Sequence, residues 1–332
     1  EEIKVTVSGT ADKYIVIKNY NDEEVIISGN NKPRELMNLN GVSYIKVKGL
    51  TFADCLGSYS VGIKISTTSD EASHHIEIES NTIRNLYANA TATVYPPNVY
   101  AGGITVAGYL DSKAIHDIII RENTVKDCRT GWTEAISVTG NVDGFLITKN
   151  VVTNTGNIGI DASGHWGISK NPATDFARNG VISENHVSYC KSPVEGGAGI
   201  YLDGSSNILV EKNISHNNVY GITVGCERAN NFVTNNIIRN NICYHNEGFG
   251  IGLMGRIIKN CQVVNNTTFE NAKDRLGEIA IYSTENTTIK NNIFYSTHAN
   301  SNLLYVDDSH LNLDMNFNHY YSSSPDVKFY WK

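Results

Sequence analysis

The sequence predicts an all-β protein, a parallel β-helix that forms one domain over residues 1–332 in about 9–11 coils. Three observations lead to this prediction. A short strand that ends in asparagine recurs at intervals of 25 to 42 residues, a second alternating strand lies between these units, and helical periodicity is nearly absent. Because each coil of a solenoid buries its inner face only against neighbouring coils, such a repeat predicts a rod.

The first element of the repeat is an apolar alternation followed by asparagine. It is clear in segments such as IEIESNTI (76–83) and ILVEKNIS (208–215). Asparagine tolerates the left-handed backbone of a tight bend, and its amide can bond to the asparagine of the next coil. We therefore expect a ladder of stacked side chains, formed by Asn81, Asn123, Asn150, Asn185, Asn213, Asn241, Asn266 and Asn292.

The second element follows the pattern G-I-x-V-x-G. It is seen in GITVAG (103–108), GIDASG (159–164) and GIYLDG (199–204). Side chains alternate between the two faces of a strand, so the Ile and Val positions are expected to point into the core. The two x positions are then expected to point outward, where they form one face of the rod.

The six cysteines show no metal-ligand spacing and no CxxC pair. Cys55, Cys128 and Cys190 fall at one position of the repeat. We expect a column of buried free thiols, because unpaired cysteine behaves as a small apolar side chain.

The charge and hydropathy of the chain exclude some classes of binding partner. Charged residues make up 18 % of the chain, and the formal net charge is −7 without a basic block. This argues against a nucleic acid or an anionic membrane surface as the partner. No apolar run approaches the roughly 18 residues of a membrane span, and the first residues carry no signal-peptide pattern.

The asparagine repeat with G-I-x-V strands resembles the right-handed parallel β-helix proteins of the pectate-lyase-like superfamily. The segment SGTADKYIVIKNYNDEEVIISG (8–29) is similar to the first coil of many secreted members. The resemblance covers nearly the whole chain and implies a right-handed coil, a polysaccharide or oligosaccharide substrate, and a secreted or cell-surface location. The W-x-D-H and R-x-P-x-x-R motifs of pectate lyases are missing, so the resemblance stops at the superfamily.

Three intervals of the repeat are longer than a basal coil, which predicts loop insertions near 84–101, 165–178 and 191–197. Insertions in a solenoid form loops, often on the binding face. Two of them flank the strands that carry Asp161 and Asp203. We expect these strands to form the floor of a substrate site and the loops to form its walls.

Asp161 and Asp203 are the strongest catalytic candidates. They lie one coil and two residues apart, which places their Cα atoms roughly 8 Å from each other. Inverting glycosidases hold their carboxyl groups about 6.5–9.5 Å apart and retaining ones about 5–5.5 Å, so the spacing favours inversion. One carboxyl group would donate a proton while the other activates water. Tyr201, in the row of Asp161, could orient that carboxyl group or donate a proton.

Further candidates lie beyond the strand ends or in the long loops. The ring of Trp166 could stack on a sugar, although loop packing explains it equally well. An isolated outward aspartate is more often a solvated residue, so the hypothesis depends on the pairing of Asp161 with Asp203. Glu195 and His165 are additional catalytic candidates, and the candidate substrate-binding residues are Trp166, Glu134, Glu227, Arg228, Arg256, Lys170 and Arg178.

The sequence leaves three functions open. The preferred one is a glycoside hydrolase that uses the carboxylate pair. The second is a polysaccharide lyase or C5-epimerase on a uronate-containing polymer, in which His165, Tyr201, Lys170 or Arg178 abstracts the C5 proton. The third is a non-catalytic carbohydrate-binding β-helix. Lyases of this fold often use Ca²⁺, but the sequence has no D-x-D-x-D cluster, so a Ca²⁺ cofactor is left open and no metal ligands are assigned.

Overall fold

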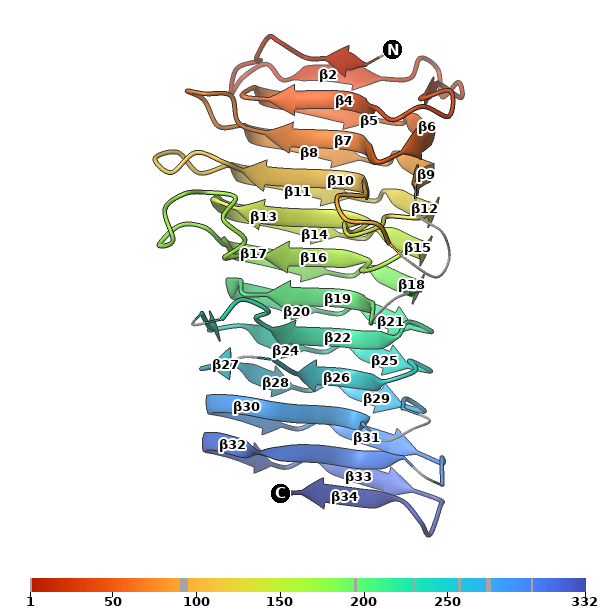
Figure 1. Cartoon of the computed structure of the whole chain (residues 1–332), viewed down its shortest axis with the longest axis vertical. Helices are drawn as coiled ribbons and strands as arrows, with labels where there is room; N and C mark the ends of the chain where they lie inside the picture. The colour runs from red at the N-terminus through yellow and green to blue at the C-terminus, as the bar shows by residue number, and fades with distance from the viewer. Residues whose placement is uncertain are drawn as a thin grey trace.

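The computed structural model describes residues 2–89, 95–193, 196–229, 231–255, 258–272, 276–299 and 301–332. Over these residues the chain winds into a parallel β-helix, with its two termini at opposite ends of a rod (Figure 1). The strands stack in register from coil to coil and form three faces, which we call sheets 1, 2 and 3. The predicted fold class is therefore confirmed.

Sheet 1 contains the G-I-x-V strands and faces the viewer in Figure 1. Its strands are β1 (Ile3–Lys4), β4 (Glu35–Asn40), β7 (Tyr59–Ser66), β10 (Tyr100–Gly108), β13 (Ile136–Gly140), β16 (Ile160–Ser163), β19 (Ala198–Asp203), β22 (Tyr220–Gly225), β26 (Phe249–Leu253), β30 (Gly277–Lys290), β32 (Asn302–Asn316) and β34 (Lys328–Trp331). The long strands β30 and β32 bend and continue into sheet 2.

Sheet 2 contains the strands that precede the ladder asparagines. They are β2 (Ile15–Lys18), β5 (Ser43–Lys48), β8 (His74–Glu79), β11 (His116–Arg121), β14 (Val142–Thr148), β17 (Ala177–Ser183), β20 (Ser206–Glu211), β23 (Val233–Thr234), β24 (Ile237–Arg239), β27 (Ile258–Lys259) and β28 (Gln262–Val264).

Sheet 3 follows the asparagines and has 11 strands, about one for each coil. They are β3 (Ile26–Ser28), β6 (Thr51–Gly57), β9 (Thr82–Ala88), β12 (Thr124–Cys128), β15 (Val151–Thr155), β18 (His186–Cys190), β21 (Ile214–His216), β25 (Ile242–Tyr244), β29 (Thr267–Phe269), β31 (Ile293–Ser296) and β33 (His319–Ser322). In the part of the chain that the structure describes, we find no helix with the length and apolar character of a membrane span.

The asparagine ladder forms as predicted and continues one coil further, to Asn318. At each step the side-chain amide donates to the Oδ1 atom of the next asparagine, as Asn81 does to Asn123 at 3.1 Å. The left-handed backbone, however, belongs to the preceding residue, for example Ser80 with φ 53°. The ladder amide instead satisfies peptide groups of the bend, because Asn123 Nδ2 also donates to the Ile78 carbonyl at 2.9 Å.

A second, shorter ladder lies at the other end of the sheet 3 strands. The amide of Asn246 donates to Asn271 Oδ1 at 2.8 Å, and the amide of Asn271 donates to Glu278 Oε2 at 2.6 Å. Asn218 extends this ladder by one coil, because its backbone N–H donates to Asn246 Oδ1 at 3.0 Å. Glu278 therefore ends the ladder as a buried carboxyl group.

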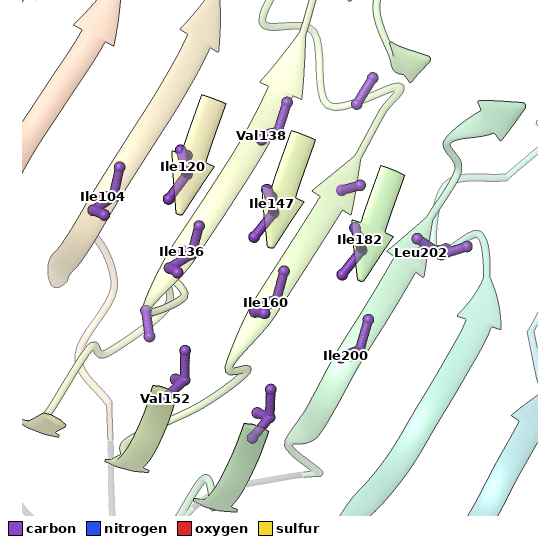
Figure 2. Packing of buried hydrophobic residues seen from close by; sticks show 14 of the residues in the cluster. Ile104, Ile120, Ile136, Val138, Ile147, Val152, Ile160, Ile182, Ile200 and Leu202 are labelled. Atoms are coloured by element: carbon purple, nitrogen blue, oxygen red, sulfur yellow. The ribbon is translucent and has the colours of Figure 1, made fainter. Parts of the chain in front are cut away.

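Aliphatic side chains of all three sheets fill the interior (Figure 2). Ile136, Ile160 and Ile200 pair in register on adjacent strands of sheet 1, and all three are fully buried. This inward row determines which side of each strand points into the core, because a register slip of one residue would expose these side chains.

The predicted column of buried free thiols is also confirmed. All six cysteines are buried, and in the described part of the chain they form no disulfide. Thr155 lies in register between Cys128 and Cys190, and Leu86 is in register with Cys55, so the thiols alternate with other small or apolar side chains.

Candidate functional site

The outward row of sheet 1 places the candidate residues side by side. Asp161 on β16 is in register with Ser137 on β13 and with Tyr201 on β19, and Tyr201 is in register with Thr223 on β22. Asp203 lies two residues beyond Tyr201, at the end of β19. The alternation predicted from G-I-x-V therefore places both aspartates on one face of the rod, in neighbouring coils.

Asp161 is buried although it is on the outward face, with 3 % of its surface exposed. Its Oδ1 atom has no hydrogen-bond partner. Burial raises the pKa of this carboxyl group well above its usual range, and the nearby charges of Glu134 and Asp203 raise the pKa further. These surroundings favour the protonated, neutral form of Asp161.

Asp203 is equally buried, but its carboxylate has hydrogen-bond donors. The indole Nε1–H of Trp166 donates to Oδ2 at 2.8 Å, and the backbone N–H of Glu227 donates to Oδ1 at 2.9 Å. Burial raises its pKa to about 6, and these donors together with the charge of Arg228 counteract part of the increase. The two neighbouring carboxyl groups thus have different surroundings.

Glu134 and Tyr201 complete the group of interacting acids. Glu134 precedes β13, and burial followed by the charges of Asp203 and Glu227 raises its pKa to about 8. The phenol of Tyr201 is partly buried, and burial together with the Asp203 charge raises its pKa. At neutral pH the Tyr201 hydroxyl group therefore keeps its proton.

Trp166 lies in a loop of residues 164–176, the Trp166 loop, which projects from the rod after β16 (Figure 1). Asp175 accepts hydrogen bonds from the backbone N–H groups of Gly167 at 2.6 Å and Ser169 at 2.8 Å. Asp111, from the loop after β10, accepts bonds from Ser169 Oγ at 2.8 Å and from the N–H groups of residues 170 and 171 at 2.7 and 3.1 Å. The two aspartates thus hold the loop beside the acids.

Trp166 and Arg228 form one wall of the site. Trp166 is 41 % exposed, and the Arg228 guanidinium carbon lies 3.7 Å from the centre of its indole ring. This is the geometry of a cation–π contact. A positive charge is thereby held next to the Asp203 carboxylate.

His165 adopts a left-handed backbone with φ 66° and packs against Phe176, with 5.5 Å between the ring centres. Its ring also approaches Gly204, the residue after Asp203. Burial lowers the pKa of His165, so the imidazole is neutral at pH 7. The ring therefore packs between Phe176 of the loop and Gly204, which follows Asp203.

The structure does not bring every candidate to this face. Arg178 lies on β17 of sheet 2, where its guanidinium bonds to Asp143 at 3.0 Å and to Asn141 at 2.9 Å. Lys170 is exposed in the Trp166 loop. Glu195 and Arg256 lie outside the described residues, as do parts of the predicted insertions at 84–101 and 191–197.

Trp132 is an aromatic residue that the sequence reasoning missed. It precedes Glu134 by two residues and is 44 % exposed. Its indole N–H donates to the Pro96 carbonyl at 2.9 Å, and its ring meets Tyr95 edge-on at 5.5 Å. The tryptophan beside an acid in GWTE (131–134) was the available signal. Trp132 precedes β13 and Trp166 follows β16, so the two rings flank the acids from opposite strand ends.

The acids of this face bear on the Ca²⁺ cofactor that the sequence left open. Among the residues with described positions, these carboxyl groups do not bring three ligand atoms within 4.8 Å of one another. Ca²⁺ takes six to eight oxygen ligands. The described acids of the face therefore form no preformed site of that kind.

Comparison with known proteins identifies the fold family. The family model described as "Right handed beta helix region" matches residues 120–274 and 166–325. The protein YwoF of Bacillus subtilis (strain 168) is 32 % identical over 339 residues, covering 96 % of this chain and 70 % of YwoF. This chain belongs to the right-handed β-helix family. The resemblance inferred from the repeat is thus confirmed.

Several solved structures share the fold at 14 % identity. The native GH136 lacto-N-biosidase of Eubacterium ramulus superposes with a TM-score of 0.71 over 97 % of this chain and 60 % of its own. The DFA-IIIase of Arthrobacter chlorophenolicus A6, in complex with GF2, has a TM-score of 0.64 over 92 % and 79 %. The Azotobacter vinelandii mannuronan C-5 epimerase AlgE4 A-module has a TM-score of 0.56 over 95 % and 80 %. The chain thus spans 60 % of the lacto-N-biosidase. These structural neighbours are carbohydrate-active β-helix enzymes.

Proposed function

We propose that this protein hydrolyses a glycosidic bond of an oligosaccharide or polysaccharide, with Asp161 as general acid and Asp203 as the ionised partner. The proposal depends chiefly on one observation. Two buried carboxyl groups on adjacent coils have contrasting surroundings, since Asp161 Oδ1 has no partner and Asp203 accepts two hydrogen bonds. Such a contrast is how glycosidases assign the acid and the base to two similar groups.

These surroundings determine which of the two carboxyl groups carries a proton. Asp161 keeps its proton because burial and the neighbouring Asp203 carboxylate raise its pKa. It would give this proton to the oxygen of the leaving sugar. Asp203, with a pKa of about 6, is ionised at pH 7 and would either activate water or attack the anomeric carbon. The inversion favoured by the strand spacing stays a prediction.

The surroundings of the acids suit a sugar. Ser137 and Thr223, next to Asp161 and Tyr201 in the outward row, are small and carry hydroxyl groups. Trp132 and Trp166 expose aromatic rings on either side. Aromatic rings offer apolar area with a polar N–H edge, which is suited to the apolar faces of pyranoses. The carbohydrate-active enzymes among the structural neighbours support the same substrate class, and we propose a secreted or cell-surface location with it.

Elimination or C5-epimerisation on a uronate-containing polymer is the second candidate, and the neutral imidazole of His165 next to Gly204 is the observation that favours it. The Arg228 guanidinium beside Asp203 could bind a uronate carboxylate. Tyr201 is a poor proton acceptor because its pKa is raised, and Arg178 is engaged with Asp143. His165 would therefore be the base in this reaction.

The test is an incubation with a panel of neutral and uronic oligosaccharides and polysaccharides, with and without Ca²⁺, in which reducing ends and ultraviolet absorbance are read together. New reducing ends without absorbance support hydrolysis, whereas unsaturated products that absorb indicate elimination. Asp161→Asn and Asp203→Asn should each lower the rate by about 100-fold or more. Asp314→Asn, which removes an exposed carboxylate paired with Lys290, is the matched control and should leave the rate unchanged.

Full activity in both Asp161→Asn and Asp203→Asn would refute the catalytic assignment. If products that absorb in the ultraviolet are formed and their formation depends on His165, the reaction is elimination and the second candidate replaces hydrolysis. A saccharide that binds and is recovered intact from every incubation would overturn the enzyme proposal in favour of a carbohydrate-binding β-helix.

A further inference from the structure

A cluster of histidines lies on sheet 2, away from the acids of sheet 1. One ligand atom each of His75, His116 and Asp117 lies within 4.8 Å of the other two. His116 Nδ1 is 2.7 Å from Asp117 Oδ2, and His75 Nε2 is 3.6 Å from the same oxygen. The side chains are 35 %, 43 % and 59 % exposed for His75, His116 and Asp117, so an ion can reach them from solvent.

The fold itself brings these residues together. His74 and His116 begin β8 and β11 and are in register on adjacent coils. The residues that follow them, His75 and Asp117, both adopt the left-handed backbone, with φ 51° and 52°. Because the same local conformation occurs in two stacked coils, residues 42 positions apart direct their side chains to one point.

We propose that His75, His116 and Asp117 form a binding site for a divalent transition-metal ion of the Zn²⁺, Ni²⁺, Co²⁺ and Cu²⁺ class. Imidazole nitrogen suits these ions, whereas Ca²⁺ and Mg²⁺ prefer ligands that are all oxygen. Ligands about 2.1 Å from a tetrahedral ion lie about 3.4 Å apart, so small side-chain rotations from the present positions suffice. Two imidazoles and one carboxylate leave a fourth position for water.

His74 is the positioning residue of this site. Its Nδ1 atom is 2.9 Å from Nδ1 of His75, and its ring stacks on His116 with the centres 4.9 Å apart and the planes parallel to within 1°. When His75 donates its Nδ1 proton to His74, the Nε2 lone pair is directed toward Asp117. Tyr44 packs against His75 at 4.7 Å and supports that ring from the preceding coil.

Binding changes the tautomer of His116. In the ion-free protein the His116 Nδ1–H can donate to Asp117 Oδ2, which lies 2.7 Å away. A metal bound through this nitrogen needs its lone pair, so the neutral imidazole of His116 takes the tautomer that carries its proton on Nε2. The ion then replaces the proton between the imidazole and the carboxylate and links β8 to β11.

The experiment uses the full chain after treatment with a chelator, with Zn²⁺ titrated by calorimetry and Co²⁺ followed by its visible absorption. We expect one ion per chain. His75→Asn, His116→Ala and Asp117→Asn should each weaken binding by about tenfold or more. Asparagine is chosen at positions 75 and 117 because it tolerates the left-handed backbone. His74→Phe keeps a ring next to His116 but removes the bond to His75, and should weaken binding by about 10–100-fold.

A second histidine pair provides the matched control. His186 and His216 on sheet 3 face each other with their Nε2 atoms 2.7 Å apart. The double variant His186→Ala and His216→Ala should bind Zn²⁺ like the unaltered protein. Far-UV circular dichroism and the Tm in the presence of chelator verify that each variant is folded.

Three results would overturn the proposal. These are a chain that binds neither Zn²⁺ nor Co²⁺, binding that persists in folded His116→Ala and Asp117→Asn, and binding that disappears only in the His186 and His216 variant. The readouts require no saccharide, so they are independent of the proposed hydrolase activity.

Discussion

Replacement of Asn213 by alanine should remove a central step of the asparagine ladder and destabilise the rod strongly. Asn213 Oδ1 accepts hydrogen bonds from the backbone N–H and the side-chain amide of Asn185, both at 2.9 Å. Its own amide donates to the Ile182 carbonyl at 2.9 Å and to Asn241 Oδ1 at 3.0 Å. Asn213→Ala therefore leaves two donors of Asn185 without their acceptor in a buried place. At about 1–3 kcal/mol for each such group, the free energy of unfolding should fall by about 2–6 kcal/mol.

Urea unfolding followed by far-UV circular dichroism measures this loss. The control is Asn207→Gly, at an exposed asparagine whose φ of 57° glycine adopts freely. This change removes one exposed hydrogen bond to Asn179 and should alter the free energy by less than about 0.5 kcal/mol. A loss below about 1 kcal/mol in Asn213→Ala, or one equal to that of the control, would refute the claim that the ladder satisfies buried groups of the bends.

Three other predictions concern titratable groups and thiols. Trp166→Phe removes a hydrogen bond that lowers the pKa of Asp203, so the acidic limb of the pH profile of kcat/KM should shift to higher pH; an unchanged limb contradicts the role of Asp203. Burial raises the pKa of Glu278 to about 8 in the folded chain, so folding favours its protonated form. The contribution of Glu278 to the free energy of unfolding is complete below about pH 4.5 and is lost as the pH rises to about 8. Glu278→Gln should therefore flatten the fall in Tm over this range. Finally, the six buried thiols should react with Ellman's reagent only after unfolding, and rapid labelling of the native chain would contradict their burial.

The repeat made the fold predictable because each coil obeys the same physical constraints. Alternation identified the inward Ile136, Ile160 and Ile200, and the recurring asparagine identified the ladder. The second ladder was missed, although Asn218, Asn246 and Asn271 recur at intervals of 28 and 25 residues, because cysteine and threonine take this position in earlier coils.

The candidate site was only partly predictable. Register placed Asp161 and Asp203 on one face, but alternation says nothing about how deeply an outward residue is covered, and Asp161 proved to be buried. The partners of loop residues depend on tertiary folding. Arg178 pairs with Asp143 on sheet 2, and the backbone N–H of Lys170 bonds to Asp111 from a different loop. No local sequence pattern predicts such contacts.

The anchoring of the Trp166 loop has a consequence for how the protein discriminates among ligands. Asp111 and Asp175 accept five hydrogen bonds from this loop before any ligand arrives. Ordering a flexible segment costs about 1–2 kcal/mol per residue in conformational entropy, and here that loss occurs during folding. An incoming molecule thus meets a preorganised surface and cannot improve a poor fit by drawing the loop around itself. Selectivity then depends on rigid shape, and we expect small chemical changes in a ligand to alter its dissociation rate more than its association rate.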